Sequence, residues 1–531
     1  MTPRRPIRKW RTILIVLLGL VATVASSSVP GEIVPHLPYD PLEYTWVEVP
    51  KVTVRWQGEM AGEVTQDSVI LQARLTVDGK VRSGDVKGRP GIAAFALSTA
   101  ENFSSAFRTR WMVASSSNDY IVKTRITELE PGTRYYYRLL SGPDVGWVEA
   151  GPTGTFRTLD ARGVSRQVRL VVVTGMNRFA FRATVLRDGA IKERSLGFPA
   201  LATIVSHEPD FFIGTGDNVY YDCPFVGRAK SREHMRAKWH RQLATPRFAT
   251  LFQRVPTLWE KDDHDFRYDD ADPFGEVEPS AELGSEIFME QVPVVDPSAE
   301  NPVMYRTHRL NDLLQIWLVE GRDYRDANTE LPGPNKSLWG DEQVAWFKQT
   351  LLESDATFKV LISPIPMIGP DDTMKGVQGG LLAPLFGGAP VGQGEDMRKR
   401  DNHTNPYGFK DEADSLFDWL SENGFQDKNF YTVCGDRHWQ YHSIRPDGFE
   451  EFSVGALVDG NARLGREPGD DMSTDPNGLI SQPYLQGEAS GGFLEITVRP
   501  PKGEKPATAE FAFYDEHGVR LYVAEKTARY L

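Results

Sequence analysis

Short runs of apolar residues divide the chain into two regions with different patterns. From about residue 47 to 158, the runs are rich in β-branched and aromatic residues, and clusters of Gly, Pro, Asp and Asn separate them. Short strands bounded by turn residues in this way are typical of a β-sandwich. The pattern predicts strands at 52–56, 68–77, 108–114, 120–126, 134–140 and 154–158.

A second pattern begins near residue 168 and continues to residue 531, after a linker at 161–167. Apolar runs that fit buried strands alternate with longer segments of helical character, which predicts α/β organisation. The expected strands are 168–173, 210–214, 255–260, 313–320, 358–364 and 429–435, with a further strand and hairpin at 492–498 and 508–523. The expected helices are 195–206, 231–244, 340–352 and 411–423, and two segments are expected to be loop-rich, 265–300 and 371–408.

The first 25 residues predict a signal peptide. Five basic side chains precede the apolar run 13–25, which is short for a membrane span. We therefore expect export to the periplasm, the cell envelope or the exterior. The pair Arg4-Arg5 fits the twin-arginine route weakly, and a general secretory signal is the alternative. A signal that is not cleaved would serve as a membrane anchor.

Charge and cysteine content exclude two classes of protein. Lys and Arg number 60 against 73 Asp and Glu, a net charge of −13. Sequence-independent nucleic-acid binding needs a cationic surface, so we expect no nucleic-acid partner. Two cysteines in 531 residues exclude a disulfide scaffold, and the length predicts two to four domains.

Polar residues of unusual type follow the C-terminal ends of four predicted buried strands. Open α/β sheets bind ligands in the crevice beyond these ends, so the four groups are expected to converge on one site. The candidate residues are Asp217, Tyr220, Asp263, His264, Arg322, Arg325, Asp436 and His438.

The chemistry of these residue types favours hydrolysis of phosphate esters over hydrolysis of peptides. Crowded carboxylates repel one another unless cations lie between them. Two cations bridged by a carboxylate would polarise a phosphoryl oxygen and lower the pKa of a bound water. Arg322 and Arg325 can bind a phosphate in bidentate geometry, although pairing with neighbouring acids is the alternative for both.

Five motifs in order resemble the alkaline phosphatase D (PhoD-like) family of the metallophosphatase superfamily, which is related to purple acid phosphatases. They are Gly216-Asp217-x-x-Tyr220, Asp262-Asp263-His264-Asp265, Arg322-x-Tyr324-Arg325, Trp339-Gly340-Asp341-Glu342-Gln343 with Trp346, and Gly435-Asp436-x-His438.

The resemblance implies a four-layer α/β/β/α catalytic domain over residues 168–531, preceded by a fibronectin type III-like β-sandwich at 47–158. Segment 129–138 looks like the corner of such a sandwich, where a Tyr hydroxyl ties a loop to the next strand. The resemblance also implies an exported, metal-dependent phosphomonoesterase or phosphodiesterase that acts on a phosphate ester with a metal-activated water.

Roles for individual residues follow from the same resemblance. Asp217 would bridge the metals, and Tyr220 would bind a ferric ion. Asp263 lies where the superfamily usually has a metal-binding Asn, and His264 would contact substrate and protonate the leaving group. Asp436 replaces the first His of Gly-His-x-His, and His438 is the second. Carboxylate in place of imidazole favours iron(III) or calcium over zinc, with magnesium or manganese as alternatives.

One departure from the family concerns a metal-binding Cys expected just after strand 168–173. Met176 lies at or next to this position, and a thioether is a poor ligand for ferric ion or calcium. Asn177 could supply an amide oxygen. We expect Cys434 to be an inert core thiol, and Cys223 to be structural or solvent-facing.

Two other functions compete with ester hydrolysis by an intact phosphatase site. One is a cell-envelope binding protein that uses its sandwich and carries a degenerate, inactive site. The other is a phosphatase-fold enzyme that acts on a different ester. The presence of Asp217, Tyr220, Asp263, His264, Asp436 and His438 together argues against degeneration.

Overall fold

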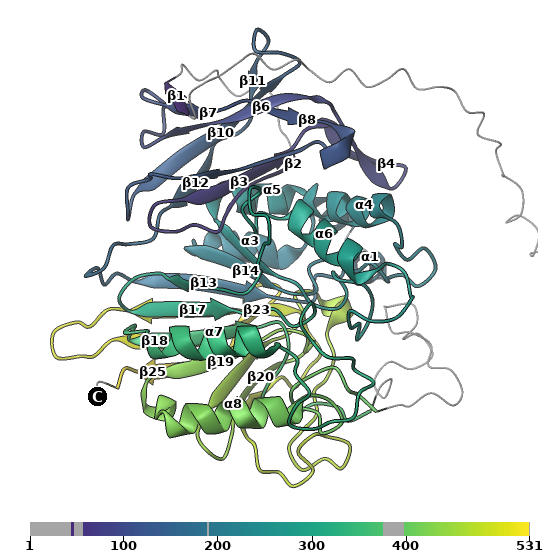
Figure 1. Ribbon diagram of the computed structural model, residues 1–531, viewed down its shortest axis with the longest axis vertical. Coiled ribbons are helices and arrows are strands. Elements are labelled where there is room, and N and C mark those ends of the chain that lie inside the picture. Colours follow the sequence, from purple (N-terminus) through teal and green to yellow (C-terminus); the bar gives the residue numbers. More distant parts are fainter. Residues whose placement is uncertain (1–43, 47–56, 188–190, 375–397, 530–531) are drawn as a thin grey trace, which may run out of the picture.

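The protein consists of a β-sandwich stacked on a larger α/β body (Figure 1). The computed structural model describes residues 44–46, 57–187, 191–374 and 398–529. The predicted signal peptide and the predicted strand 52–56 lie outside these residues. Within them, no helix combines the length and the apolarity that a membrane crossing requires.

The sandwich contains two antiparallel sheets and a small hairpin. The outer sheet comprises β1 (Tyr44–Trp46), β6 (Gly91–Ser98), β7 (Phe107–Thr109), β8 (Met112–Ala114), β10 (Arg134–Gly142), β11 (Glu149–Ala150) and β12 (Gly154–Arg157). The inner strands are β2 (Gln57–Gly62), β3 (Val69–Arg74) and β9 (Ile121–Ile126), and the hairpin is β4 (Thr76–Arg82) with β5 (Asp85–Gly88). The backbone N–H of Glu130 donates to the hydroxyl of Tyr135 at 2.9 Å, as expected for the corner at 129–138.

The strand β6 was not predicted, although it lies in the middle of the outer sheet. Its sequence, GIAAFALS, is mostly small residues and has only two β-branched or aromatic side chains, the types on which the prediction depended. Every residue of β6 is buried, so both of its faces are covered by protein. The predicted strand 108–114 is interrupted and forms the ends of β7 and β8.

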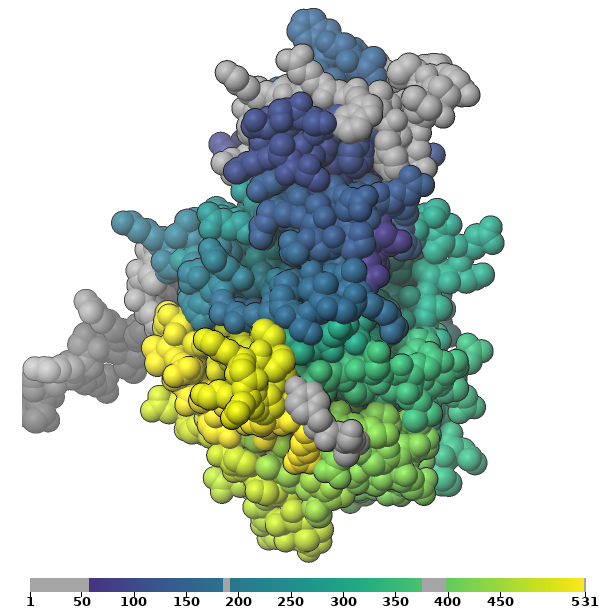
Figure 2. Space-filling view, turned by 90° about the vertical axis from the view of Figure 1, so that its left-hand side faces the viewer, coloured from purple at the N-terminus to yellow at the C-terminus, as the bar shows by residue number. Residues whose placement is uncertain are grey.

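The first sheet of the α/β body runs directly into the inner sheet of the sandwich. Its strands are β13 (Val168–Val173), β14 (Phe211–Thr215), β15 (Thr257–Glu260), β23 (Gly492–Arg499), β24 (Thr508–Asp515) and β25 (Arg520–Thr527). Thr257 of β15 pairs with Gly62 of β2, which gives one nine-stranded sheet. At the opposite edge of this sheet, the C-terminal hairpin β24–β25 lies at the surface (yellow in Figure 2).

The second sheet has seven strands and packs against the first. Its members are β16 (Arg306–Arg309), β17 (Leu314–Leu318), β18 (Phe358–Ser363), β19 (Phe430–Cys434), β20 (Gln440–Ile444), β21 (Glu450–Val454) and β22 (Ser481–Leu485). Strands β17, β18 and β19 are parallel, as are β13, β14 and β15.

Helices cover the outer face of each sheet and complete four layers (Figure 1). On the first sheet they are α1 (Arg178–Arg187), α2 (Ile191–Leu196), α3 (Pro199–Ser206), α4 (Arg232–Leu243), α5 (Pro246–Arg254) and α6 (Ala281–Gln291). On the second they are α7 (Asp341–Leu352) and α8 (Lys410–Glu422), and short 3₁₀ turns occur at Ser116–Asn118, Phe425–Asp427 and Asp459–Asn461. Segment 265–300, which was predicted to be loop-rich, also contains the helix α6, which the sequence did not predict.

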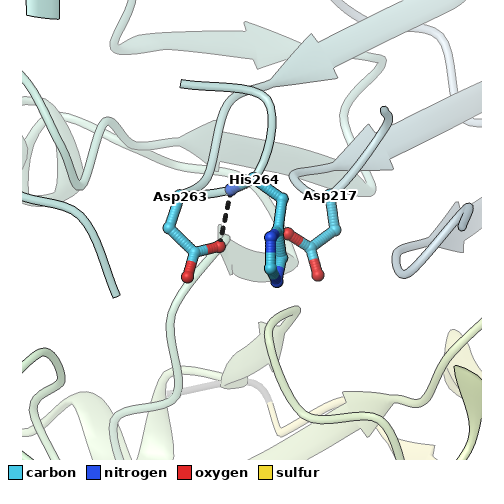
Figure 3. A group of neighbouring side chains, drawn as sticks. All are labelled: Asp217, Asp263 and His264. Atoms are coloured by element: carbon cyan, nitrogen blue, oxygen red, sulfur yellow. Dashed lines mark hydrogen bonds between the residues drawn. The ribbon is translucent and has the colours of Figure 1, made fainter. Parts of the chain in front are cut away.

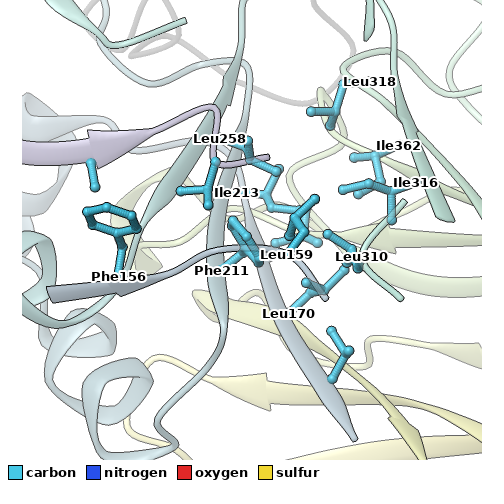
Figure 4. Close-up of a cluster of buried hydrophobic side chains, with 14 of the residues drawn as sticks. Phe156, Leu159, Leu170, Phe211, Ile213, Leu258, Leu310, Ile316, Leu318 and Ile362 are labelled. Atoms are coloured by element: carbon cyan, nitrogen blue, oxygen red, sulfur yellow. The ribbon is translucent and has the colours of Figure 1, made fainter. Parts of the chain in front are cut away.

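Successive side chains of a strand point to opposite faces of its sheet. The central strands are covered by protein on both faces, so their sequences are apolar throughout. In β13, Leu170 and Val172 contact the second sheet, whereas Val171 and Val173 contact the helices. The cluster between the sheets also includes Phe156 of the sandwich (Figure 4). The sandwich and the α/β body therefore share one hydrophobic core as well as one sheet.

A partly buried ionic group joins the sandwich to the second sheet. Glu63 follows β2, and both of its oxygens accept hydrogen bonds from Arg306 of β16, at 2.9 and 2.7 Å. His308 Nε2 lies 3.1 Å from the same carboxylate. Burial alone would raise the pKa of Glu63, but Arg306 and His308 lower it below its usual value.

We expect Glu63→Gln to lower the free energy of unfolding near neutral pH by up to about 3–5 kcal/mol, the cost of breaking a fully buried ion pair, because this pair is only slightly exposed. The folded pKa of Glu63 is lowered, so its contribution is present above the unfolded pKa and disappears as the pH falls through the folded value. Urea unfolding of both proteins between pH 3 and pH 7 measures this. A difference that grows towards acid would contradict the assignment.

Candidate metal centre

The strand ends of the two sheets meet at a position where the backbones almost touch. A Cβ atom on Gly435, directly after β19, would lie 2.4 Å from the carbonyl oxygen of Thr215 in β14 and 2.9 Å from that of Pro364. One on Gly216 would lie 2.4 Å from the Cβ of Asp262. Glycine at both positions lets the turns after β14, β15 and β19 pack together, which brings their polar side chains to one place.

Asp217 is the centre of the resulting cluster. Its Oδ2 accepts a hydrogen bond from the Tyr220 hydroxyl at 2.7 Å and lies 3.0 Å from His438 Nε2. The Tyr220 hydroxyl and His438 Nε2 are 3.2 Å apart, so these three side chains contact one another. Asp217 has a φ of 55°, a conformation that residues other than glycine seldom adopt. The turn after β14 holds this carboxylate against residues of both sheets.

Asp263 and His264 approach Asp217 from the turn after β15 (Figure 3). One ligand atom from each of these three buried residues lies within 4.8 Å of the other two. Asp263 also belongs to a second such group, with Asp269 and Asp270. Asp217 and Asp263 each have possible ligands from two separate groups of neighbours. This arrangement is compatible with more than one cation.

The His264 ring has a fixed orientation. Its Nδ1 lies 2.8 and 2.9 Å from the two oxygens of Asp222, and its face stacks on Tyr220 with 4.1 Å between centroids. Burial would lower the pKa of His264, but Asp222, Asp263 and Asp217 raise it well above its usual value. Because Nδ1 is engaged by Asp222, Nε2 is the nitrogen available to the cluster.

Electrostatics and hydrogen bonding show that the cluster fits metal ions. Burial, together with the charge of Asp263, raises the pKa of Asp217 to about 7, although His264 opposes this. The Oδ1 of Asp217 is buried and accepts no hydrogen bond from the described residues. A buried carboxylate oxygen without a donor is costly, and a cation would satisfy it. Burial and nearby cations also keep the pKa of His438 well below its usual value, which favours the neutral, metal-binding form.

Asp436 and the two candidate arginines have partners outside this cluster. Asp436 pairs with the neighbouring Arg437 and is not part of the compact donor groups among the described residues. Arg322 is fully buried and binds Asp262, with Nε 2.6 Å from Oδ1. Arg325 donates to the carbonyl oxygens of Gly321 and Asp401, and one of its terminal nitrogens is buried without an acceptor in the described chain. A terminal nitrogen of Arg322 likewise has no hydrogen-bond acceptor in the described chain, but Arg322 is already paired with the Asp262 carboxylate, so Arg325 has more capacity for a phosphate.

Comparisons with known proteins agree with this geometry. A family model described as PhoD-like phosphatase matches residues 190–474, more than half of the chain, and one described as PhoD-like phosphatase, N-terminal domain, matches residues 52–160. The chain belongs to the PhoD-like phosphatase family.

Relatives within and near this family share the fold over most of the chain. Alkaline phosphatase D of Bacillus subtilis (strain 168) is 23% identical over 330 residues, 58% of this chain and 55% of that protein, so the match spans about half of the relative's length. The solved structure of PhoD covers 90% of this chain and 94% of its own, with a TM-score of 0.64 and 18% identity. A purple acid phosphatase from yellow lupin (Lupinus luteus) seeds covers 89% and 74%, with a TM-score of 0.54 and 12% identity.

In this PhoD-like chain, Met176 belongs to the apolar layer beneath the helices. Its side chain is buried in the cluster that contains Val171 and Val173, and its backbone N–H donates to the carbonyl oxygen of Asp217 at 2.9 Å. The Asn177 Oδ1 accepts hydrogen bonds from the first turn of α1. Cys434 is a buried core thiol, as expected, and burial raises the pKa of Cys223 to about 11.

Several residues of the site were not found from the sequence. Asn461 donates to the Tyr220 hydroxyl at 2.7 Å, and Asp222 engages His264. Asp269 and Asp270 lie beside Asp263. Asp222 lies two residues after the motif that ends at Tyr220, but nothing in the local sequence distinguished it from a surface acid.

We expect Arg322→Met to lower the free energy of unfolding by about 3–5 kcal/mol, because it leaves the Asp262 carboxylate buried without its cation. The matched control is Arg232→Met, which breaks the exposed pair of Arg232 with Glu286 and is expected to cost about 0–1 kcal/mol. Urea denaturation of both variants measures the difference. Equal costs would show that the buried pair contributes no more than a surface pair.

Proposed function

We propose that the protein is an exported, metal-dependent phosphoric ester hydrolase that acts on phosphomonoesters or phosphodiesters. The observation that carries the proposal is the Asp217 carboxylate, buried at the junction of two groups of ligands with one oxygen unsatisfied. Membership of the PhoD-like phosphatase family supports a phosphate ester as the substrate. The basic and apolar segment at the N-terminus supports export.

The donor chemistry supports hard cations. Asp217, Tyr220 and His438 would hold one ion, and Asp217 with Asp263 would hold another. Carboxylate and phenolate oxygens suit iron(III), calcium, magnesium or manganese. When bound, such ions would polarise the phosphoryl group and supply a water of lowered pKa.

The remaining residues position the substrate and move a proton. His264 Nε2 would donate a proton to the leaving group, and Asp222 would hold the ring in that orientation through Nδ1. Arg325 would use its free terminal nitrogen to bind a phosphoryl oxygen. Gln343 supports the loop that carries Arg325. Its side-chain amide accepts a hydrogen bond of 2.7 Å from the backbone N–H of Glu320 and donates one of 2.8 Å to the carbonyl oxygen of Glu320.

Removing the central carboxylate tests the metal site directly. Asp217→Asn removes the negative charge shared by both donor groups, so we expect metal content to fall and phosphate ester hydrolysis to drop by at least tenfold while the fold persists. Elemental analysis, calorimetry with Mn²⁺ or Ca²⁺, and circular dichroism measure the three effects. Retention of both metal content and turnover would rule out the bridging role of Asp217.

The Asp222–His264 contact separates a proton-transfer role for His264 from metal binding. Asp222→Asn keeps the shape but removes the charge that orients the imidazole, and loss of such a partner typically lowers activity about 10–100-fold. We expect this loss on aryl phosphates with metal content unchanged. If the metal content falls together with the rate, His264 is a ligand and not the acid.

A further inference from the structure

A cavity beside the metal centre is lined by cationic side chains. It has a volume of about 240 Å³ and lies between the first turn of α1, the turn after Tyr220 and the C-terminal half of α4. Tyr220 and Cys223 form part of its wall, and the Tyr220 hydroxyl contacts Asp217. The four cationic residues that line it are Arg178, Arg182, Lys238 and Arg241.

These cations repel one another. The pKa of Arg178 falls to about 10 because of burial and because of the charges of Arg182 and Arg241. Burial and the charge of Arg241 lower the pKa of Lys238 to about 8. Four positive charges around one cavity destabilise the folded chain unless an anion offsets them.

The described residues supply little negative charge to this cavity. No carboxylate of the described chain forms an ion pair with Arg178, Arg182 or Arg241, and Lys238 donates to the backbone carbonyl of Cys223. Asp85 near Arg241 and Asp222 near Lys238 offset part of the positive charge, but only at longer range than an ion pair.

Three buried arginines elsewhere in the described chain have acidic partners, whereas buried Arg267 and Arg325 donate to carbonyl and amide oxygens. Arg74 binds Asp119, Arg322 binds Asp262, and Arg437 binds Asp371. The cavity differs from these three sites because it gathers several arginines and a lysine in one place without a paired carboxylate among the described residues. Guanidinium groups without carboxylates bind phosphate well, because their paired N–H donors match its oxygens.

We propose that this cavity is a second anion-binding site, which takes a phosphate dianion next to the metal centre. The dianion is either free inorganic phosphate or a second phosphate group on the substrate. This goes beyond the proposed hydrolase activity, since the site uses none of the residues assigned to hydrolysis other than the ring of Tyr220. An anion here would contact the same tyrosine that touches Asp217.

The test is calorimetric titration of the full-length protein with inorganic phosphate at constant ionic strength, both as purified and after dialysis against a chelator. We expect binding that survives chelation and that Arg178→Gln with Arg241→Gln weakens at least tenfold. The matched control, Arg232→Gln, alters an arginine of α4 that is paired with Glu286 and lies outside the cavity. Binding that chelation abolishes, or that the double variant retains, would overturn the proposal.

Thermal unfolding gives a second readout that does not depend on hydrolysis. Because removal of a cation relieves repulsion, Arg182→Gln should raise the melting temperature in phosphate-free buffer and reduce the stabilisation that phosphate confers on the wild type. A lower melting temperature together with full stabilisation by phosphate would contradict the site. If the double variant fails to fold, this single substitution decides the question.

Kinetics identify the source of the phosphate and rest on the proposed hydrolase function. A rise in KM of the double variant for a bisphosphate ester, with no change for a monophosphate ester, assigns the cavity to the second phosphate of a substrate. Equal KM values with weakened calorimetric binding assign it to free phosphate. Both results support the site, whereas failure of hydrolysis altogether would leave the calorimetric result unaffected.

Discussion

The need to neutralise buried carboxylates determines how this site is built. Asp217 and Asp263 lie close together away from solvent, and burial raises the pKa of Asp217 to about 7. His264 offsets part of this charge, and the remaining unsatisfied oxygen of Asp217 is suited to a cation. The same requirement holds for Asp262, which lies next to Asp263 and is neutralised by Arg322. In the loop after β15, Asp262 thus pairs with Arg322, whereas the neighbouring Asp263 remains available to bind a metal ion.

This arrangement requires two sheets to approach one another closely at their carboxyl ends. The space between the turns after β14, β15 and β19 has no room for side chains at Gly216 and Gly435. Apolar side chains on both faces of β13 and β18 hold the sheets and the covering helices in place. The site is consequently assembled from residues that are more than 200 positions apart, such as Asp217 and His438.

The sandwich contributes to the same rigid support, although its sequence pattern indicates an independent unit. Pairing between β2 and β15 extends the first sheet into the sandwich, and the Glu63–Arg306 contact connects it to the second sheet. Because β15 leads directly into Asp263 and His264, the sandwich lies behind the strand that positions half of the cluster. The N-terminal region therefore supports the candidate metal centre as well as forming a sandwich of its own.

The sequence alone determined the elements that depend on local pattern. Buried strands such as β13 and β18 and helices such as α4 are visible as apolar runs and helical segments, and the polar residues after them identify Asp217, Asp263, His264 and His438. It also identified Tyr220 by its spacing from Asp217. Elements without such a signal were missed, because the small residues of β6 and the loop-like flanks of α6 carry little periodicity.

Only the tertiary structure decided which polar groups meet. Asp222 and Asn461 have no distinguishing local signal, yet they hold His264 and Tyr220 because the turn after β14 folds against the segments that follow β15 and β21. Pairing of Arg322 with Asp262, and the absence of such partners for Arg178 among the residues that the structure describes, likewise depend on distances between segments remote in the chain. Local sequence specifies hydrophobic faces and turns. Which charged groups neutralise one another depends instead on the distances between remote segments, and these distances are fixed only when the two sheets pack together.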